Sequence, residues 1–116
     1  MKKFYYLDTC DTCKRIMKEL PLEGITLREI KSQPPSEAEI DSIAKKAGGY
    51  EAIFSKRAVQ YRELGLQNQK LTEADYKKYL LTHYTFLKRP VLETSETAIA
   101  GNSKKAIADM AALLNQ

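Results

Sequence analysis

A Cys-x-x-Cys motif at a strand-to-helix turn constrains the fold of this chain more than any other feature. The motif, Cys-Asp-Thr-Cys at residues 10 to 13, follows an aromatic and apolar run at residues 2 to 7 that favours a buried strand. A helical pattern comes next and ends at Pro21. Its apolar members are Cys13, Ile16, Met17 and Leu20. Gly24 then predicts a turn before a second strand at residues 25 to 30.

This β-α-β order places the motif where α/β sheets carry their active sites. A right-handed crossover makes the two strands parallel, so the cysteines lie at the carboxyl end of the first strand. The start of the helix stabilises a thiolate through its unpaired N–H groups and its dipole. We therefore expect Cys10 to be the nucleophile. Cys13, one helical turn further on, is the candidate resolving thiol, which attacks a mixed disulfide formed on Cys10.

Two other roles for the cysteines compete with catalysis. A structural zinc ion needs four ligands, and His83 is the one other soft donor in the chain, so no metal site is expected. Cys13 shares its helical face with Met17 and Leu20, and packing as a small apolar residue stays open as its role. His83 itself is expected at a helix end, where an imidazole interacts favourably with the dipole.

The centre of the chain predicts a helical insertion, at about residues 34 to 84, between two halves of a sheet. After Pro34-Pro35, Ser36 and Glu39 form the pattern of a capping box, which marks the start of a helix. Thr72 and Asp75 mark the start of another. Two short helices are expected between them, at residues 50 to 54 and 58 to 64.

The last third of the chain predicts a hairpin and a final helix. The hairpin strands are expected at residues 91 to 93 and 97 to 100, and Ser103 caps the helix. The whole order, β-α-β, helical insertion, β-β-α, predicts an α/β thioredoxin-like fold with a four-stranded mixed sheet. Pro90 precedes the third strand, where such folds can place a cis proline beside the nucleophile, although its spacing alone favours the trans form.

Length and charge narrow the class of protein further. A chain of 116 residues suits one domain with its own core, residues 1–116. No signal peptide and no membrane-spanning run is recognisable, so we expect a cytoplasmic protein with no membrane partner. In a reducing compartment a Cys-x-x-Cys pair is more often catalytic or redox-sensing than structural. The net charge of +4 is dispersed and does not indicate nucleic-acid binding.

Four segments resemble the arsenate reductase family of the glutaredoxin type (ArsC), which includes the Spx regulators and YffB-like proteins. They are Cys10 after the first strand and residues 54 to 66, 71 to 73 and 87 to 92. The resemblance implies that Arg89 faces the catalytic Cys10 and that Pro90 is cis. A guanidinium in that place lowers the pKa of a thiol and binds an oxyanion through two hydrogen bonds.

The resemblance also completes the predicted site. Arg57 matches an arginine of Spx and YffB-like members and is the second candidate cation. The predicted catalytic residues are Cys10, Cys13 and Arg89, and the predicted substrate-binding residues are Asp11, Thr12, Arg57 and Pro90.

Departures from the family pattern affect which substrate is expected. Arsenate reductases surround their cysteine with three arginines, and Ser55 and Gly101 stand at two of those positions here. Lys14 and Arg15 supply nearby charge without restoring the pattern. We expect a thiol oxidoreductase that reduces a disulfide or an oxyanion, with Cys13, glutathione or thioredoxin as the resolving thiol and no bound cofactor. Its partner is then a small thiol or a redox protein.

A second function stays open. In Spx a Cys-x-x-Cys disulfide switches a surface that docks the RNA polymerase α subunit, and the same role is the alternative here. Spx-like proteins usually continue into a longer charged segment, whereas this sequence ends in the pattern of an apolar-faced helix. The enzyme is therefore the favoured prediction.

Overall fold

The computed structural model describes residues 1–116 and contains a four-stranded mixed sheet in the order β2-β1-β3-β4. Strand β1 (Lys2–Tyr6) pairs in parallel with β2 (Thr26–Glu29) and antiparallel with β3 (Val91–Thr94). Strand β4 (Ala98–Ala100) closes the hairpin with β3. This is the predicted α/β thioredoxin-like arrangement, with the strands in the expected chain order.

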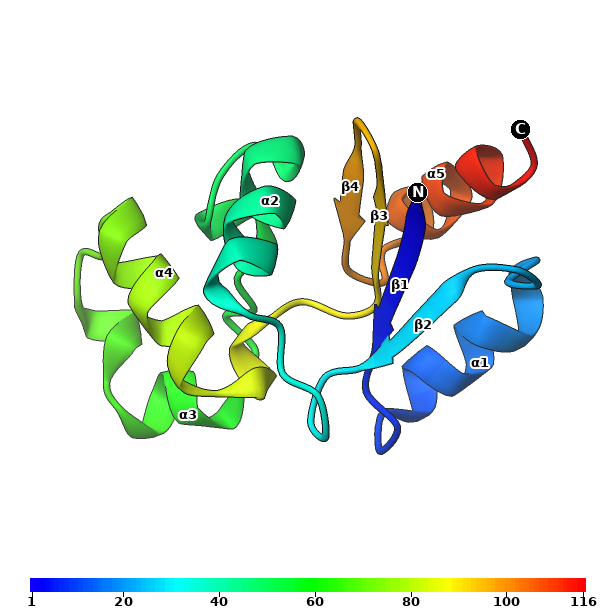
Figure 1. The fold of residues 1–116 in the computed structure, drawn as a ribbon. Coiled ribbons are helices and arrows are strands. Elements are labelled where there is room, and N and C mark those ends of the chain that lie inside the picture. Colours follow the sequence, from blue (N-terminus) through cyan, green and yellow to red (C-terminus); the bar gives the residue numbers. More distant parts are fainter.

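Alternating side chains of the central strands divide the core into two layers. Helices α1 (Asp11–Glu19) and α5 (Lys104–Leu114) cover one face of the sheet, where the buried cluster is entirely apolar. It consists of Phe4, Ile16, Leu20, Leu92 and Met110. Tyr5 and Val91 point to the other face, which the central helices cover (Figure 1). Burial of these side chains supplies most of the driving force for folding.

The helical insertion lies between β2 and β3. It comprises α2 (Glu37–Ala47), η1 (Glu51–Ile53), α3 (Val59–Glu63), η2 (Leu66–Asn68), α4 (Glu73–Thr82) and η3 (Tyr84–Phe86). Both predicted helix starts are confirmed, at α2 and α4, and each has a capping box. The single turns η2 and η3 were not predicted, since a three-residue helix has no periodicity to detect.

Helix α2 docks on the sheet partly through a polar seam, which consists of Glu39, Ser42, Lys46 and Glu93 with Tyr5. Glu93 is only 3% exposed, and it accepts hydrogen bonds from Ser42 Oγ at 2.6 Å and Lys46 Nζ at 3.0 Å. The Tyr5 hydroxyl lies 3.3 Å from Glu93 and 3.4 Å from Glu39. Buried carboxylates tolerate such a place only when they are paired in this way.

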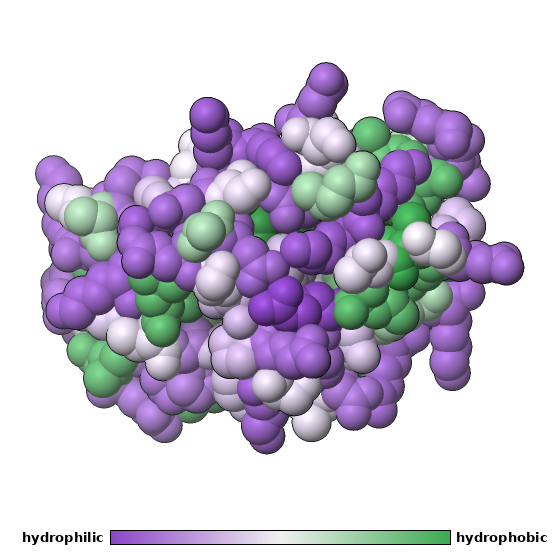
Figure 2. All heavy atoms as spheres, viewed as in Figure 1, coloured by the Kyte–Doolittle hydropathy of each residue, from purple (hydrophilic) through white to green (hydrophobic).

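The outer surface carries few large apolar groups. The face in Figure 2 is largely hydrophilic, and its main hydrophobic area lies over the part built by α1 and α5. None of the helices has the length and apolar character needed to cross a membrane.

Candidate active site

The turn between β1 and α1 holds the two cysteines in different environments. Cys10 is the N-cap of α1, and its Sγ accepts a hydrogen bond from the backbone N–H of Cys13 at 3.4 Å. Cys10 is half-buried, whereas Cys13 is 0% exposed and lies on the core side of the helix. Both cysteines are free thiols. An N-cap sulfur replaces the oxygen that usually accepts from the first turn, so a negative charge on it is favoured.

The two thiols have opposite pKa shifts. Burial raises the pKa of Cys10, but hydrogen bonds from Cys13 and the charge of Arg89 outweigh this and lower it overall. Burial is also the main effect on Cys13 and, together with the neighbouring Cys10, raises its pKa to about 12. Of the two thiols, Cys10 is therefore the one that loses its proton more readily.

Arg89 reaches this site from the segment that precedes β3. Its Nη1 donates hydrogen bonds to the carbonyl oxygens of Thr85, at 3.1 Å, and Leu87, at 3.2 Å. The Nε of the same guanidinium is buried without a hydrogen-bond partner. The Arg89–Pro90 peptide bond is cis, as the resemblance implied, and the trans form favoured by spacing alone was wrong.

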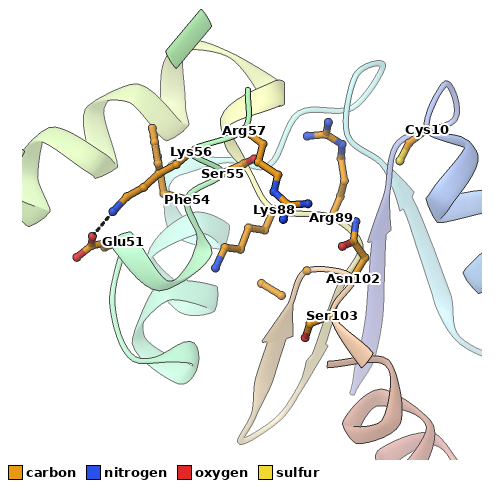
Figure 3. Close-up of a pocket in the computed structure, with 12 residues that line it drawn as sticks. Cys10, Glu51, Phe54, Ser55, Lys56, Arg57, Lys88, Arg89, Asn102 and Ser103 are labelled. Atoms are coloured by element: carbon orange, nitrogen blue, oxygen red, sulfur yellow. Dashed lines mark hydrogen bonds and ion pairs between the residues drawn. The ribbon is translucent and has the colours of Figure 1, made fainter. Parts of the chain in front are cut away.

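A cavity of about 660 Å³ opens beside Cys10, between the sheet and the helical insertion (Figure 3). Its lining consists of Cys10, Glu51, Phe54, Ser55, Lys56, Arg57, Lys88, Arg89, Ala100, Gly101, Asn102 and Ser103. In Figure 3 the side chain of Arg89 stands beside Cys10, and Arg57 reaches in from the insertion. Ligand pockets for small organic molecules span about 300–1,000 Å³, so this cavity is large enough for a peptide-sized group.

Positive charge dominates the cavity lining. Lys56 is paired with Glu51 at 2.7 Å, which leaves that part of the wall neutral. Arg57 and Lys88 have no ion pair and no side-chain hydrogen bond. The cavity therefore presents two uncompensated cations beyond Arg89, and it favours an anionic ligand.

The structure brings together only some of the predicted site residues. Cys10, Arg57 and Arg89 line the cavity. Cys13 lies behind Cys10 in the core, and Pro90 is buried. Asp11 and Thr12 lie in the first turn of α1, outside the cavity lining, as do the exposed Lys14 and Arg15. The assigned roles of all these residues remain predictions.

Sequence reasoning missed Lys88 and the loop before α5. Lys88 directly precedes the Arg-Pro pair, which was a usable signal for its position. Its Cδ lies 3.7 Å from where a Cβ on Gly101 would stand, and Gly101 has a left-handed φ of 107°. The aliphatic part of the Lys88 side chain thus packs over Gly101.

Comparisons with known proteins agree with the fold. The model of the ArsC family matches residues 5–110. An ArsC family related protein of Bacteroides fragilis superposes with a TM-score of 0.79, at 24% identity over 94% of this chain and 96% of that one. The arsenate reductase of Vibrio cholerae gives 0.74, at 19% identity over 94% and 96%. A Streptococcus mutans protein described as a possible arsenate reductase gives 0.73, at 25% identity over 95% and 97%. No curated protein matches the chain.

Proposed function

The chain belongs to the ArsC family, and on that premise we propose that it is a thiol reductase whose Cys10 thiolate attacks the disulfide of an anionic peptide. The observation that carries this proposal is the position of Cys10, which caps α1 and lines a basic cavity together with Arg89. The lowered pKa of Cys10 and the raised pKa of Cys13 agree with it. A lowered pKa gives Cys10 a larger thiolate fraction near neutral pH, and the thiolate is the form that reacts.

The reaction has two thiol exchanges. The Cys10 thiolate attacks one sulfur of the substrate disulfide, a mixed disulfide forms on Cys10, and the other half of the substrate leaves as a thiolate. A second thiol then attacks the Cys10 sulfur and releases the remaining half. If that thiol is Cys13, the product is a Cys10–Cys13 disulfide, which takes two electrons from glutathione or thioredoxin.

Cys13 suits the resolving step because of its place behind Cys10. Its backbone nitrogen lies 3.4 Å from Cys10 Sγ, and its raised pKa is partly due to Cys10 itself. Once Cys10 is in a mixed disulfide it has no charge, so this contribution disappears and Cys13 ionises more readily. An external thiol is the alternative resolving group, since Cys13 stays fully buried in the free protein.

The cavity favours a disulfide peptide over a lone tetrahedral oxyanion. The volume of about 660 Å³ exceeds what a single oxyanion fills. Arg57 and Lys88 offer two separate charges that match carboxylates of a peptide such as glutathione. The same cations also attract arsenate, so arsenate belongs in the substrate panel.

The test is a reduction panel with a glutathione mixed disulfide, a neutral disulfide and arsenate, each supplied with glutathione or thioredoxin. We expect turnover with the anionic disulfide and none in Cys10→Ser. Cys13→Ser separates the two resolving routes, because it traps a mixed disulfide if Cys13 resolves and keeps its turnover if glutathione does. Activity that survives in Cys10→Ser would refute the proposal.

In the regulator alternative, oxidation of the cysteines changes the affinity for a binding partner, whereas in the enzyme it is a step of turnover. A redox switch docks the RNA polymerase α subunit with an affinity that depends on the Cys10–Cys13 disulfide, and it needs no turnover. Binding of the purified α subunit to the reduced and the oxidised protein measures this directly. A redox-dependent affinity in a protein that turns over no member of the panel would favour the switch.

A further inference from the structure

His83 lies at the junction between α4 and η3, where aromatic rings and hydrogen bonds surround its imidazole. Its ring stacks on Tyr84, with 4.5 Å between centroids, and meets the edge of Phe86 at 6.5 Å. The backbone N–H of Thr85 donates to His83 Nδ1 at 3.2 Å, so this nitrogen is an acceptor. The Thr85 hydroxyl oxygen lies 2.7 Å from the same nitrogen. The imidazole thus acts as the N-cap of η3.

The turn that His83 caps is also the turn that holds Arg89. The carbonyl oxygen of Thr85 and that of Leu87, the residue after η3, both accept from Arg89 Nη1. One residue, Thr85, therefore contacts His83 through its N–H and hydroxyl and Arg89 through its carbonyl. A change at the imidazole reaches the guanidinium through a single amino acid.

This attachment sets the direction of the guanidinium. The group is planar, so fixing Nη1 on two carbonyls also fixes where Nε and the other nitrogen point. Nε is buried and has no hydrogen-bond partner. Arg89 lines the same cavity as Cys10, and its charge acts on the Cys10 thiol. A tilt of the ring plane would move this charge relative to the sulfur, and charge effects depend strongly on distance.

We propose that His83 is a positioning residue for the reductase: its imidazole holds the η3 turn whose carbonyls aim the Arg89 guanidinium at Cys10. The inference rests on the proposed function, because it assigns His83 a part in activating the same thiol. His83 lies outside the cavity lining and touches no substrate in this scheme.

The test measures the reactivity of Cys10 without any substrate. Alkylation of Cys10 by iodoacetamide is followed across pH by mass spectrometry of the modified peptide, on the full chain. An opposite charge nearby shifts a thiol pKa by about 1–3 units, so partial loss of alignment in His83→Ala should slow alkylation about threefold below the Cys10 pKa. His83→Asn keeps an acceptor near the Nδ1 position and should restore most of the rate.

Two controls separate positioning from a general loss of structure. Thr82→Val removes another side-chain hydrogen bond at the end of α4, from Thr82 Oγ1 to Tyr79, and should leave Cys10 reactivity unchanged. In an Arg89→Gln background, His83→Ala should have no further effect, because the proposed route runs through Arg89.

An unchanged Cys10 pH profile in folded His83→Ala would overturn the proposal, as would an equal effect in the Arg89→Gln background. These readouts need no turnover, so they stand even if the substrate panel shows no reductase activity. Conversely, if His83→Ala does not change the reactivity of Cys10, the role of Cys10 in the proposed function still stands.

Discussion

The two walls of the cavity are built in different ways. On the sheet wall, formed by Cys10, Arg89 and Gly101, each group is tied to the backbone: Cys10 caps α1, Arg89 is bound to two carbonyls, and Gly101 N–H donates to Pro90. On the insert wall, formed by Ser55, Lys56 and Arg57, the backbone is fixed by the Phe54–Leu87 bridge, but Lys56 and Arg57 are exposed.

This difference suits the sheet wall to the reaction and the insert wall to substrate binding. A reacting group must be held within a fraction of an ångström of its productive position, and backbone contacts do that on the sheet wall. A charged group that only attracts and orients a flexible anion works from an exposed, adaptable position. The following changes probe each wall in turn.

Arg89→Gln should have the largest effect. It removes one of the groups that lower the Cys10 pKa, so the thiolate fraction should fall and the turnover at neutral pH should drop about tenfold. The sign follows from the thiolate being the reactive form, so activity returns as pH rises through the new pKa. The pH profile of kcat/KM for the anionic disulfide measures this shift of the Cys10 pKa.

The matched control is Arg62→Gln, which removes an exposed arginine of α3 outside the cavity. It should keep both the rate and its pH profile. A pH profile that does not move in Arg89→Gln would show that Arg89 leaves the Cys10 thiol unaffected.

Helix α2 of the insertion docks on the sheet through the polar seam, and Glu39→Gln should weaken that seam. Burial opposes the charge of Glu39, but the Ser36 N–H, Arg28 and Lys3 lower its pKa from 4.5 to about 2. Glu39 is therefore more stabilising when ionised. Because solvent screens this partly exposed carboxylate, Glu39→Gln should lower the free energy of unfolding at neutral pH by about 1–2 kcal/mol, less than the full pKa shift implies.

The pH dependence of this difference is a direct check. A carboxylate with a lowered pKa in the folded state contributes stability above pH 4.5 and loses it as the pH falls towards 2. Urea unfolding of wild type and Glu39→Gln should therefore differ at neutral pH and converge in acid. A constant difference at every pH would mean that lost packing, not charge, is responsible.

The sequence predicted those parts of the two walls that depend on residues close together in the chain. The Cys-x-x-Cys turn and both capping boxes are local patterns, and the structure confirms the helix starts that they mark. The approach of Arg89 to Cys10 came from the resemblance, because nothing in the spacing of residues 10 and 89 indicates contact. The lining by Lys88 and Ser103 was missed, since it depends on how the insertion packs against the sheet.

The connection from His83 through Thr85 to Arg89 could not be predicted from the sequence for a related reason. The contact between His83 and Thr85 is local, but it forms only because residues 84 to 86 adopt a single helical turn. That turn is held by contacts from both sides, with Phe86 stacked on Phe54 of the insertion at 5.1 Å. Tertiary packing therefore decides a short element that no periodicity marks.

Arg57→Ala should have the smallest effect of these changes and should act on binding alone. Loss of one exposed, unpaired cation from the insert wall should raise KM for the anionic disulfide about fivefold, at about 1 kcal/mol, and leave kcat unchanged. The double variant Glu51→Gln/Lys56→Gln removes a neighbouring ion pair without changing the net charge, and it should leave KM close to wild type.

Measurements at high salt and with a neutral disulfide show whether lost charge causes the rise in KM of Arg57→Ala. The difference between Arg57→Ala and wild type should shrink at high ionic strength, because an exposed charge is screened over about 10 Å at 0.1 M salt. It should be absent for the neutral disulfide, which has no carboxylate to bind. Equal rises in KM for Arg57→Ala and Arg62→Ala would mean that overall charge attracts the substrate, and the division of labour between the two walls would then be wrong.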